Sequence, residues 1–199
     1  MPQIDYMPSL YIIAGCNGSG KTTASFTILP KILSCKEFVN ADEIARGISP
    51  FQPNEVALES GRIMLQRINE LLDANEDFAV ETTLASKLYK NFITKAKQRK
   101  YETTLVFLWL NSVELAVERV KIRVNEGGHD IPLDTIIRRY KRGLLNFFSL
   151  YKNLTKNWIF IDNSGVPYKE IAQSIDGKID IFNNQVWQYI KDNYEKNNI

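Results

Sequence analysis

Cysteine and histidine are scarce in this 199-residue sequence, which contains two cysteines and one histidine. Cys16 and Cys35 match neither a disulfide framework nor the spacing of a zinc site. A metal centre built on His129 is not expected, because protein metal sites combine several ligands. We interpret His129 as a turn residue or as part of the basic segment described below.

Long apolar runs are also absent from the sequence. No stretch approaches the roughly 18 apolar residues needed to span a bilayer, and the start, MPQIDYMPS, lacks the basic end and apolar stretch of a signal peptide. Apolar residues form 44% and charged residues 24% of the chain, as in ordinary globular proteins. We therefore expect a single domain over residues 1–199, located in the cytoplasm and without membrane contact.

Positive charge is concentrated in one segment, although the net charge of the whole chain is only +2. Between residues 119 and 142, seven basic residues outnumber three acidic ones, so this segment carries +4 and the remainder −2. The basic residues are Arg119, Lys121, Arg123, Arg138, Arg139, Lys141 and Arg142. The total charge does not indicate nucleic-acid binding, whereas a local basic cluster indicates a clamp for phosphate groups.

A glycine-rich loop interrupts the stretch IIAGCNGSGKTTAS (12–25). Its order, G-x-x-x-x-G-K-T, lies between an apolar run and a helix-like stretch, which is the context of a phosphate-binding loop. Such a loop points backbone N–H groups at phosphate oxygens; Lys21 would neutralise the β- and γ-phosphates and the Thr22 hydroxyl would hold Mg²⁺. The expected nucleotide-binding residues are Gly15, Asn17, Gly18, Ser19, Gly20, Lys21, Thr22 and Thr23.

Strand-like apolar runs alternate with helical stretches along the chain. The runs cover 10–14, 37–40, 78–82, 104–110 and 158–162. The helical stretches cover about 20–31, 54–72, 86–97, 112–124, 134–150 and 183–194. This alternation predicts an α/β fold, a three-layer P-loop NTPase sandwich with a mostly parallel five-stranded sheet and a helical lid.

Two carboxylates follow predicted strands, at the side where ligands bind in open parallel sheets. Asp42, just past the second strand, could take a proton from an attacking hydroxyl or could cap a helix. Arg46, one turn further, could bind an anionic substrate or lie in solvent. Glu81 ends the third strand and could orient Mg²⁺-bound water, bind a substrate hydroxyl or cap the next helix, with Thr82 and Thr83 as donors to the same substrate.

The basic segment, residues 119–143, resembles a lid. Arg119 and Arg123 are four residues apart and share one helix face, and Arg138 and Arg142 repeat this spacing. Two such helices joined by the glycine-rich GGHD could close over a triphosphate and stabilise charge on the transferred group. We expect two or three of these arginines to be functional and the others to be solvated.

The last apolar run ends in FIDNSG (160–165). Its apolar residues followed by an aspartate resemble the second magnesium motif of P-loop NTPases, but no glutamate follows Asp162. We therefore interpret this segment as a loop near the adenine.

Six blocks together resemble the zeta toxin-like P-loop kinases, in particular the short bacterial subgroup called "predicted ABC-type ATPase". The blocks are NGSGKTT, NADEIARGISP, ETTL, FLWLNSVELAVERVKIRVNEGGHDIP, RRYKRGLLNF and DNSG. The resemblance extends from the first strand to DNSG. The sequence lacks the LSGGQ-like stretch that an ABC ATPase needs, and Asn40 replaces an acidic residue that the toxins carry two positions before their base.

The resemblance implies an ATP-dependent phosphotransferase that uses Mg²⁺. Family toxins phosphorylate UDP-N-acetylglucosamine and are paired with antitoxin proteins, so it also implies a small-molecule acceptor such as a UDP-sugar and an antitoxin partner. By similarity, Asp42 matches the catalytic base, Glu81 the carboxylate that binds the sugar, and Lys21 the loop lysine. The resemblance points to Arg123 and Arg138 as the phosphate-binding arginines, with Arg119 in reserve.

Other functions stay open at this point. The chain could be an ATPase or a nucleotide-dependent switch that acts on a protein partner. It could also be a kinase of nucleosides, nucleotides or RNA ends, although nucleic acid is not the partner that we expect. An interaction module with a degenerate nucleotide site is disfavoured by the intact Gly20-Lys21-Thr22.

Overall fold

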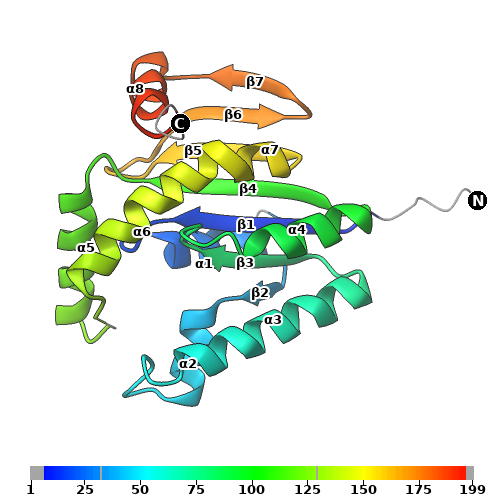
Figure 1. Ribbon diagram of the computed structural model, residues 1–199, viewed down its shortest axis with the longest axis vertical. Helices are drawn as coiled ribbons and strands as arrows, with labels where there is room; N and C mark the ends of the chain where they lie inside the picture. Colours follow the sequence, from blue (N-terminus) through cyan, green and yellow to red (C-terminus); the bar gives the residue numbers. More distant parts are fainter. Residues whose placement is uncertain (1–6, 32, 129, 196–199) are drawn as a thin grey trace, which may run out of the picture.

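The computed structural model describes residues 7–31, 33–128 and 130–195, so His129 and its expected place in a turn lie outside the described residues. One twisted sheet runs through the molecule, with helices on both of its faces (Figure 1). The strands are β1 (Ser9–Gly15), β2 (Glu37–Val39), β3 (Phe78–Thr82), β4 (Glu102–Trp109), β5 (Asn157–Asp162), β6 (Lys169–Ile175) and β7 (Lys178–Ile181). The helices are α1 (Lys21–Lys31), α2 (Ala41–Ile48), α3 (Ala57–Ala74), α4 (Tyr89–Gln98), α5 (Val113–Asn125), α6 (Leu133–Asn146), the π-helix η1 (Phe147–Tyr151), α7 (Lys152–Leu154) and α8 (Asn184–Tyr194).

The parallel part of the sheet has the order β2-β3-β1-β4-β5. Its strands are apolar on both faces because both faces are covered; all five residues of β3 are buried. After β1 the chain builds β2 and β3 on one side of β1 and then crosses to place β4 on the other side. Ligands of open α/β sheets bind beyond the carboxyl ends of the strands at such a reversal, which here is the end of β1.

Within the described residues the sheet has seven strands, so the prediction of five was wrong in number, although the α/β class was right. The two additional strands, β6 and β7, form an antiparallel hairpin that joins the edge of the sheet at β5. Asp176 and Gly177 connect them with φ of 49° and 81°, as a type I′ turn requires. The Asp-Gly pair, which follows the β-branched Ile175, is a hairpin signal that the prediction of five strands did not include.

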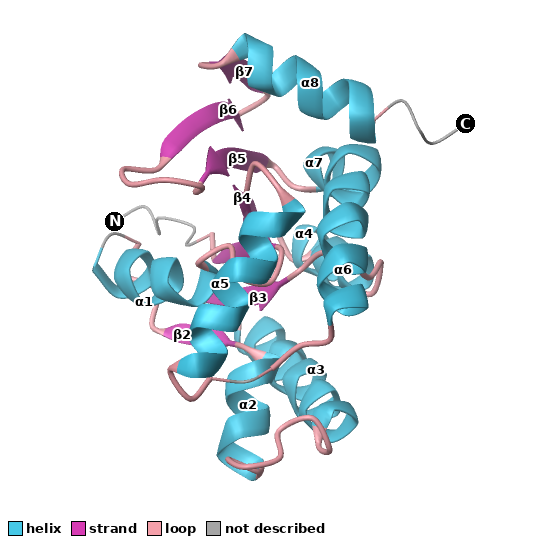
Figure 2. Ribbon diagram, turned by 90° about the vertical axis from the view of Figure 1, so that its left-hand side faces the viewer, coloured by secondary structure: helices cyan, strands magenta, loops and turns pink. Residues whose placement is uncertain are grey.

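The two faces of the sheet are covered unequally. One face carries α1, and the other carries α3, α4, α6 and α8 (Figure 2). The larger core on the second face includes an aromatic cluster in which the rings of Trp158 and Trp187 stack at 5.4 Å between centroids. None of the helices within the described ranges is long and apolar enough to cross a membrane.

The helix predicted over 134–150 is not a uniform α-helix. It continues as α6 to Asn146 and then widens into the π-helix η1, where the N–H of Lys152 donates to the carbonyl of Phe147. Ile136, Tyr140 and Leu144 of α6 are buried in the core. This half of the expected lid is therefore fixed against the sheet, and the segment between α5 and α6 is the part of residues 119–143 outside regular helices.

Candidate active site

The phosphate-binding loop leaves the end of β1 and enters α1. Gly15 and Gly20 have φ of 147° and 83°, which residues with a side chain rarely adopt. A β-carbon at Gly15 would lie 2.3 Å from the carbonyl oxygen of Leu108, and one at Gly20 would lie 2.7 Å from Nδ2 of Asn163. Both glycines are therefore required by backbone conformation and by close packing against neighbouring strands.

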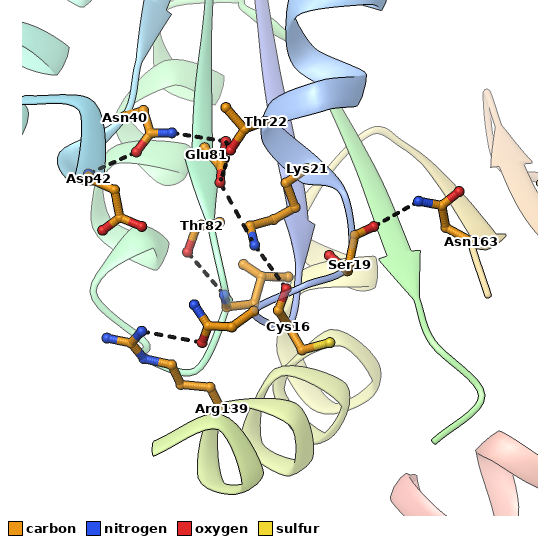
Figure 3. A network of polar contacts seen from close by, with 12 residues as sticks. Cys16, Ser19, Lys21, Thr22, Asn40, Asp42, Glu81, Thr82, Arg139 and Asn163 are labelled. Atoms are coloured by element: carbon orange, nitrogen blue, oxygen red, sulfur yellow. Dashed lines mark hydrogen bonds and ion pairs between the residues drawn. The ribbon is translucent and has the colours of Figure 1, made fainter. Parts of the chain in front are cut away.

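Lys21 begins α1 and is buried, with 7% of its surface exposed. Its Nζ donates to the carbonyl of Cys16 at 2.9 Å, so the ammonium group lies back over the loop (Figure 3). The same Nζ lies 3.8 Å from Oε1 of Glu81. The lysine is thus placed at the centre of the loop, where a bound phosphate would need its charge.

Glu81 is a buried acceptor at the end of β3, and three polar side chains converge on it (Figure 3). The Thr22 hydroxyl donates to Oε1 at 3.2 Å and to Oε2 at 2.9 Å, and Nδ2 of Asn40 donates to Oε2 at 2.9 Å. Burial raises the pKa of Glu81 above its ordinary value, while Lys21 and the Thr22 hydrogen bond oppose this shift. These contacts connect Glu81 with the phosphate-binding loop. Glu81 also lines a cavity beside that loop.

Thr22 and Glu81 fit the protein side of a magnesium site. Mg²⁺ prefers oxygen ligands and usually takes one or two protein side chains together with phosphate oxygens and water. A hydroxyl and a carboxylate at 2.9 Å supply such a pair directly beside the loop. Among the residues described, no group of three or more histidines, cysteines and acids could hold a metal ion.

Asp42 lies in the first turn of α2, a helix that was not predicted. Asn40 is its N-cap, because Oδ1 of Asn40 accepts the N–H of Asp42 at 2.8 Å. The capping role considered for Asp42 therefore belongs to Asn40, which also holds Glu81 through its other amide atom. In Figure 3 the carboxylate of Asp42 faces the same opening as Lys21 and Arg139.

Asp42 lines two neighbouring cavities of about 390 Å³ each. The first cavity lies between the phosphate loop, the segment after β3 and α6, and its lining includes Lys21, Glu81, Thr82 and Arg142. The second cavity lies between α2, the start of α3 and residues 130–135. The two cavities share Ala41, Asp42, Arg138 and Arg139.

Arg139 was not among the arginines predicted to act, yet α6 places it against the phosphate-binding loop. It donates to Oδ1 of Asn17 at 3.3 Å (Figure 3). Burial lowers the pKa of Arg139, and the carboxylate of Asp42 opposes this shift. The sequence did not single out Arg139, because residues 138–142 include four arginines and lysines. Which of them faces the phosphate-binding loop depends on how α6 packs.

The other predicted arginines are dispersed around the site. Arg138 lines both cavities, Arg123 lines the second, and Arg46 lines the second while forming an exposed ion pair with Glu43 at 3.2 Å. Arg119 instead donates to the carbonyls of Asn163 and Ser164, each at 2.9 Å. It therefore anchors the loop after β5.

That loop, DNSG, lies against the phosphate-binding loop, since Nδ2 of Asn163 donates to the carbonyl of Ser19 at 2.8 Å (Figure 3). Asp162 accepts the backbone N–H of Ser164 at 2.9 Å, so its carboxylate shapes a local turn. Thr82 likewise accepts the N–H of Leu84 at 3.0 Å while lining the first cavity. Thr23 lies in the first turn of α1 with an exposed side chain.

Comparisons with known proteins identify a family by one family model and a shared fold by solved structures. The family model described as Zeta toxin matches residues 2–166. An uncharacterized protein of Haemophilus influenzae is 29% identical over 126 residues, which is 63% of this chain and 88% of the relative.

Two solved structures share the fold. The AvrRxo1-ORF1:AvrRxo1-ORF2 structure with ATP has a TM-score of 0.74 at 16% identity. The match covers 94% of this chain but 64% of the AvrRxo1 chain, so this chain spans just under two thirds of the length of that protein. A structure of the PezAT toxin–antitoxin system of Streptococcus pneumoniae has a TM-score of 0.64 at 12% identity. The match covers 96% of this chain and 88% of the PezAT chain.

Proposed function

Because the chain belongs to the zeta toxin family of P-loop kinases, we propose that it transfers the γ-phosphoryl group of ATP to a hydroxyl of a small acceptor. The observation that carries this proposal is Asp42 at the junction of two cavities, one of which also contains Lys21 and Arg139. A carboxylate, a loop lysine and a buried arginine around one opening are the groups that phosphoryl transfer to a hydroxyl needs.

The proposed reaction assigns tasks to the side chains around the two cavities. The backbone of residues 17–22 and Lys21 hold the phosphates, and Arg138 and Arg139 neutralise charge on the transferred group. Asp42 accepts the proton of the acceptor hydroxyl while the oxygen of that hydroxyl bonds to the γ-phosphorus. The bond between the γ-phosphorus and the β–γ bridging oxygen breaks, and ADP leaves. Thr22 and Glu81 would hold Mg²⁺, which supplies charge neutralisation at the phosphates.

The second cavity favours an anionic acceptor. Arg46, Arg123 and Arg138 line it and Asp42 faces it, so an acceptor there would have a phosphate group near arginines and a hydroxyl near the base. A UDP-sugar such as UDP-N-acetylglucosamine has both groups. Thr82 and Glu81 would contact the part of the acceptor that enters the first cavity.

An antitoxin partner is part of the same proposal. The PezAT system is described as a toxin–antitoxin system, and AvrRxo1-ORF1 is seen in complex with ORF2. Both share the fold of this chain, which supports an inhibitory protein partner. Co-purification with the product of a neighbouring small gene would test this part separately.

The acceptor can be found by incubating the protein with γ-labelled ATP, Mg²⁺ and a panel of UDP-sugars, nucleosides and short RNAs. Label on a UDP-sugar, absent with Lys21→Ala, would support the proposal. Label on a nucleoside or an RNA end would replace the proposed acceptor, and label found as inorganic phosphate alone would indicate an ATPase or switch.

A further inference from the structure

Helix α6 and the π-helix η1 follow each other without a break, and together they are called the α6–η1 rod. One face of this rod contacts the loop after β3 at three places along the loop. A β-carbon at Gly143 would lie 2.6 Å from the carbonyl oxygen of Thr83, so helix and loop are in direct contact there. Nδ2 of Asn146 donates to the carbonyl of Leu84 at 2.6 Å. The Tyr151 hydroxyl donates to the carbonyl of Ser86 at 2.7 Å.

The change from α-helix to π-helix explains how one face makes all three contacts. Gly143 and Asn146 are three apart and therefore neighbours on an α-helix. Asn146 and Tyr151 are five apart, which would place them on different faces of an α-helix. A π-helix has more residues per turn than an α-helix and closes i→i+5 hydrogen bonds, so residues five apart lie much closer to one face. The π-helix η1 begins directly after Asn146 and ends at Tyr151.

The loop itself has a conformation that needs support. Leu84 is fully buried and has φ of 54°, which is uncommon for a residue with a side chain. Its N–H is held by the Thr82 hydroxyl and its carbonyl by Asn146. Strained backbone of this kind persists only where its surroundings determine it, and it occurs preferentially at functional sites.

The same rod carries the arginines of the site. Arg139 lies one turn before Gly143 and reaches Asn17 of the phosphate loop, while Arg138 and Arg142 line the first cavity. The supported loop forms another part of the wall of that cavity, through residues including Thr83 and Ser86. A single rigid element thus touches the nucleotide side and the acceptor side.

We propose that Asn146 and Tyr151 are positioning residues that couple the phosphate-binding arginines of α6 to the acceptor-side loop, residues 83–86. The inference rests on the proposed function, because it takes the first cavity as the place where the two substrates meet. Nucleotide that engages Arg139 further restrains the packed helix α6, and α6 in turn holds the loop in the conformation that receives the acceptor.

The test is amide hydrogen exchange of residues 83–88, measured with and without Mg²⁺ and a non-hydrolysable ATP analogue. In the wild type the analogue slows exchange in this segment. In Tyr151→Phe and in Asn146→Leu, the factor by which the analogue slows exchange is smaller than in the wild type by up to about tenfold. This is the effect expected from the loss of one hydrogen bond. Tyr140→Phe is the matched control, because its hydroxyl also donates from α6 to a carbonyl, that of Leu110, at 2.7 Å.

The outcomes distinguish a failure of the proposed coupling from a failure of the proposed kinase function. An analogue that binds without slowing exchange in the wild type, or that slows it equally in Tyr151→Phe, overturns the coupling while leaving the kinase intact. An analogue that does not bind overturns the proposed function and the coupling with it.

A kinetic readout distinguishes positioning from a general structural role. With UDP-N-acetylglucosamine as the acceptor probe, Tyr151→Phe raises the KM for the acceptor by a larger factor than the KM for ATP. Tyr140→Phe changes neither value. Equal effects on both KM values, or equal effects of the two variants, contradict a positioning role.

Discussion

The Thr22 hydroxyl of the phosphate-binding loop donates to both carboxylate oxygens of Glu81, at 3.2 and 2.9 Å. This pair joins the end of β3 to the start of α1, beside the position of the nucleotide phosphates. It supplies the two oxygen ligands that the chain would contribute to Mg²⁺.

Replacing Glu81 with Gln keeps the size of the side chain and removes the charge. We expect the Mg²⁺ concentration needed for half-maximal activity to rise by about 10- to 100-fold, the usual cost of disturbing a metal-binding shell. Activity measured against Mg²⁺ concentration gives this value. Glu70→Gln, at an exposed position on α3, is the control and should leave the curve unchanged; an equal shift in both variants would refute the assignment.

The raised pKa of Glu81 predicts a specific dependence of stability on pH. A carboxyl whose pKa is higher in the folded than in the unfolded protein favours folding below its unfolded value, near 4.5, and loses this contribution as pH rises through the folded value. We therefore expect Glu81→Gln to gain stability relative to wild type as pH rises from about 4.5 towards neutrality. Urea unfolding across this range measures the difference, and parallel curves would contradict the raised pKa.

Arg139 and Arg119 should differ in what they support. Arg139→Gln removes a guanidinium from the phosphate opening, so we expect kcat to fall by about 100-fold or more. Arg119→Gln releases the loop after β5 and should act mainly on nucleotide affinity. Steady-state kinetics with varied ATP separates kcat from KM, and the reverse pattern would show that the two roles are exchanged.

Gly143 and Gly61 are both helical glycines with different surroundings. A β-carbon at Gly143 meets the carbonyl of Thr83 at 2.6 Å, whereas one at Gly61 meets no described heavy atom within 4 Å. We expect Gly143→Ala to destabilise the fold by about 1–3 kcal/mol through overpacking. We expect Gly61→Ala in α3 to stabilise it by about 0.5–1 kcal/mol.

Urea unfolding of the two alanine variants checks both signs. A Gly143→Ala protein as stable as the wild type would show that α6 and the loop after β3 can move apart without cost.

Much of the fold and part of the site could be predicted from the sequence. The phosphate loop has a fixed spacing, and the strand-end positions of Asp42 and Glu81 follow from the apolar runs before them. The missing parts had weak local signals. Helix α2 has eight residues, and β7 has four exposed or half-buried residues.

The roles of Arg139 and Asn146 could not be predicted because they depend on tertiary packing. Arg139 is one of several adjacent basic residues, and only the burial of Tyr140 and Leu144 decides which of them faces the loop. Asn146 contacts the Leu84 carbonyl directly before a π-helical turn that no periodicity of the sequence indicates.

The central claim is that Asp42 is the base that activates the acceptor hydroxyl. The measurement that tests it most directly compares Asp42→Asn with the wild type for ATP binding and for phosphoryl transfer to the acceptor found with labelled ATP. We expect ATP affinity to stay within about twofold and transfer to fall by about 10²- to 10⁴-fold, the usual contribution of a general base. Undiminished transfer by Asp42→Asn would contradict the account.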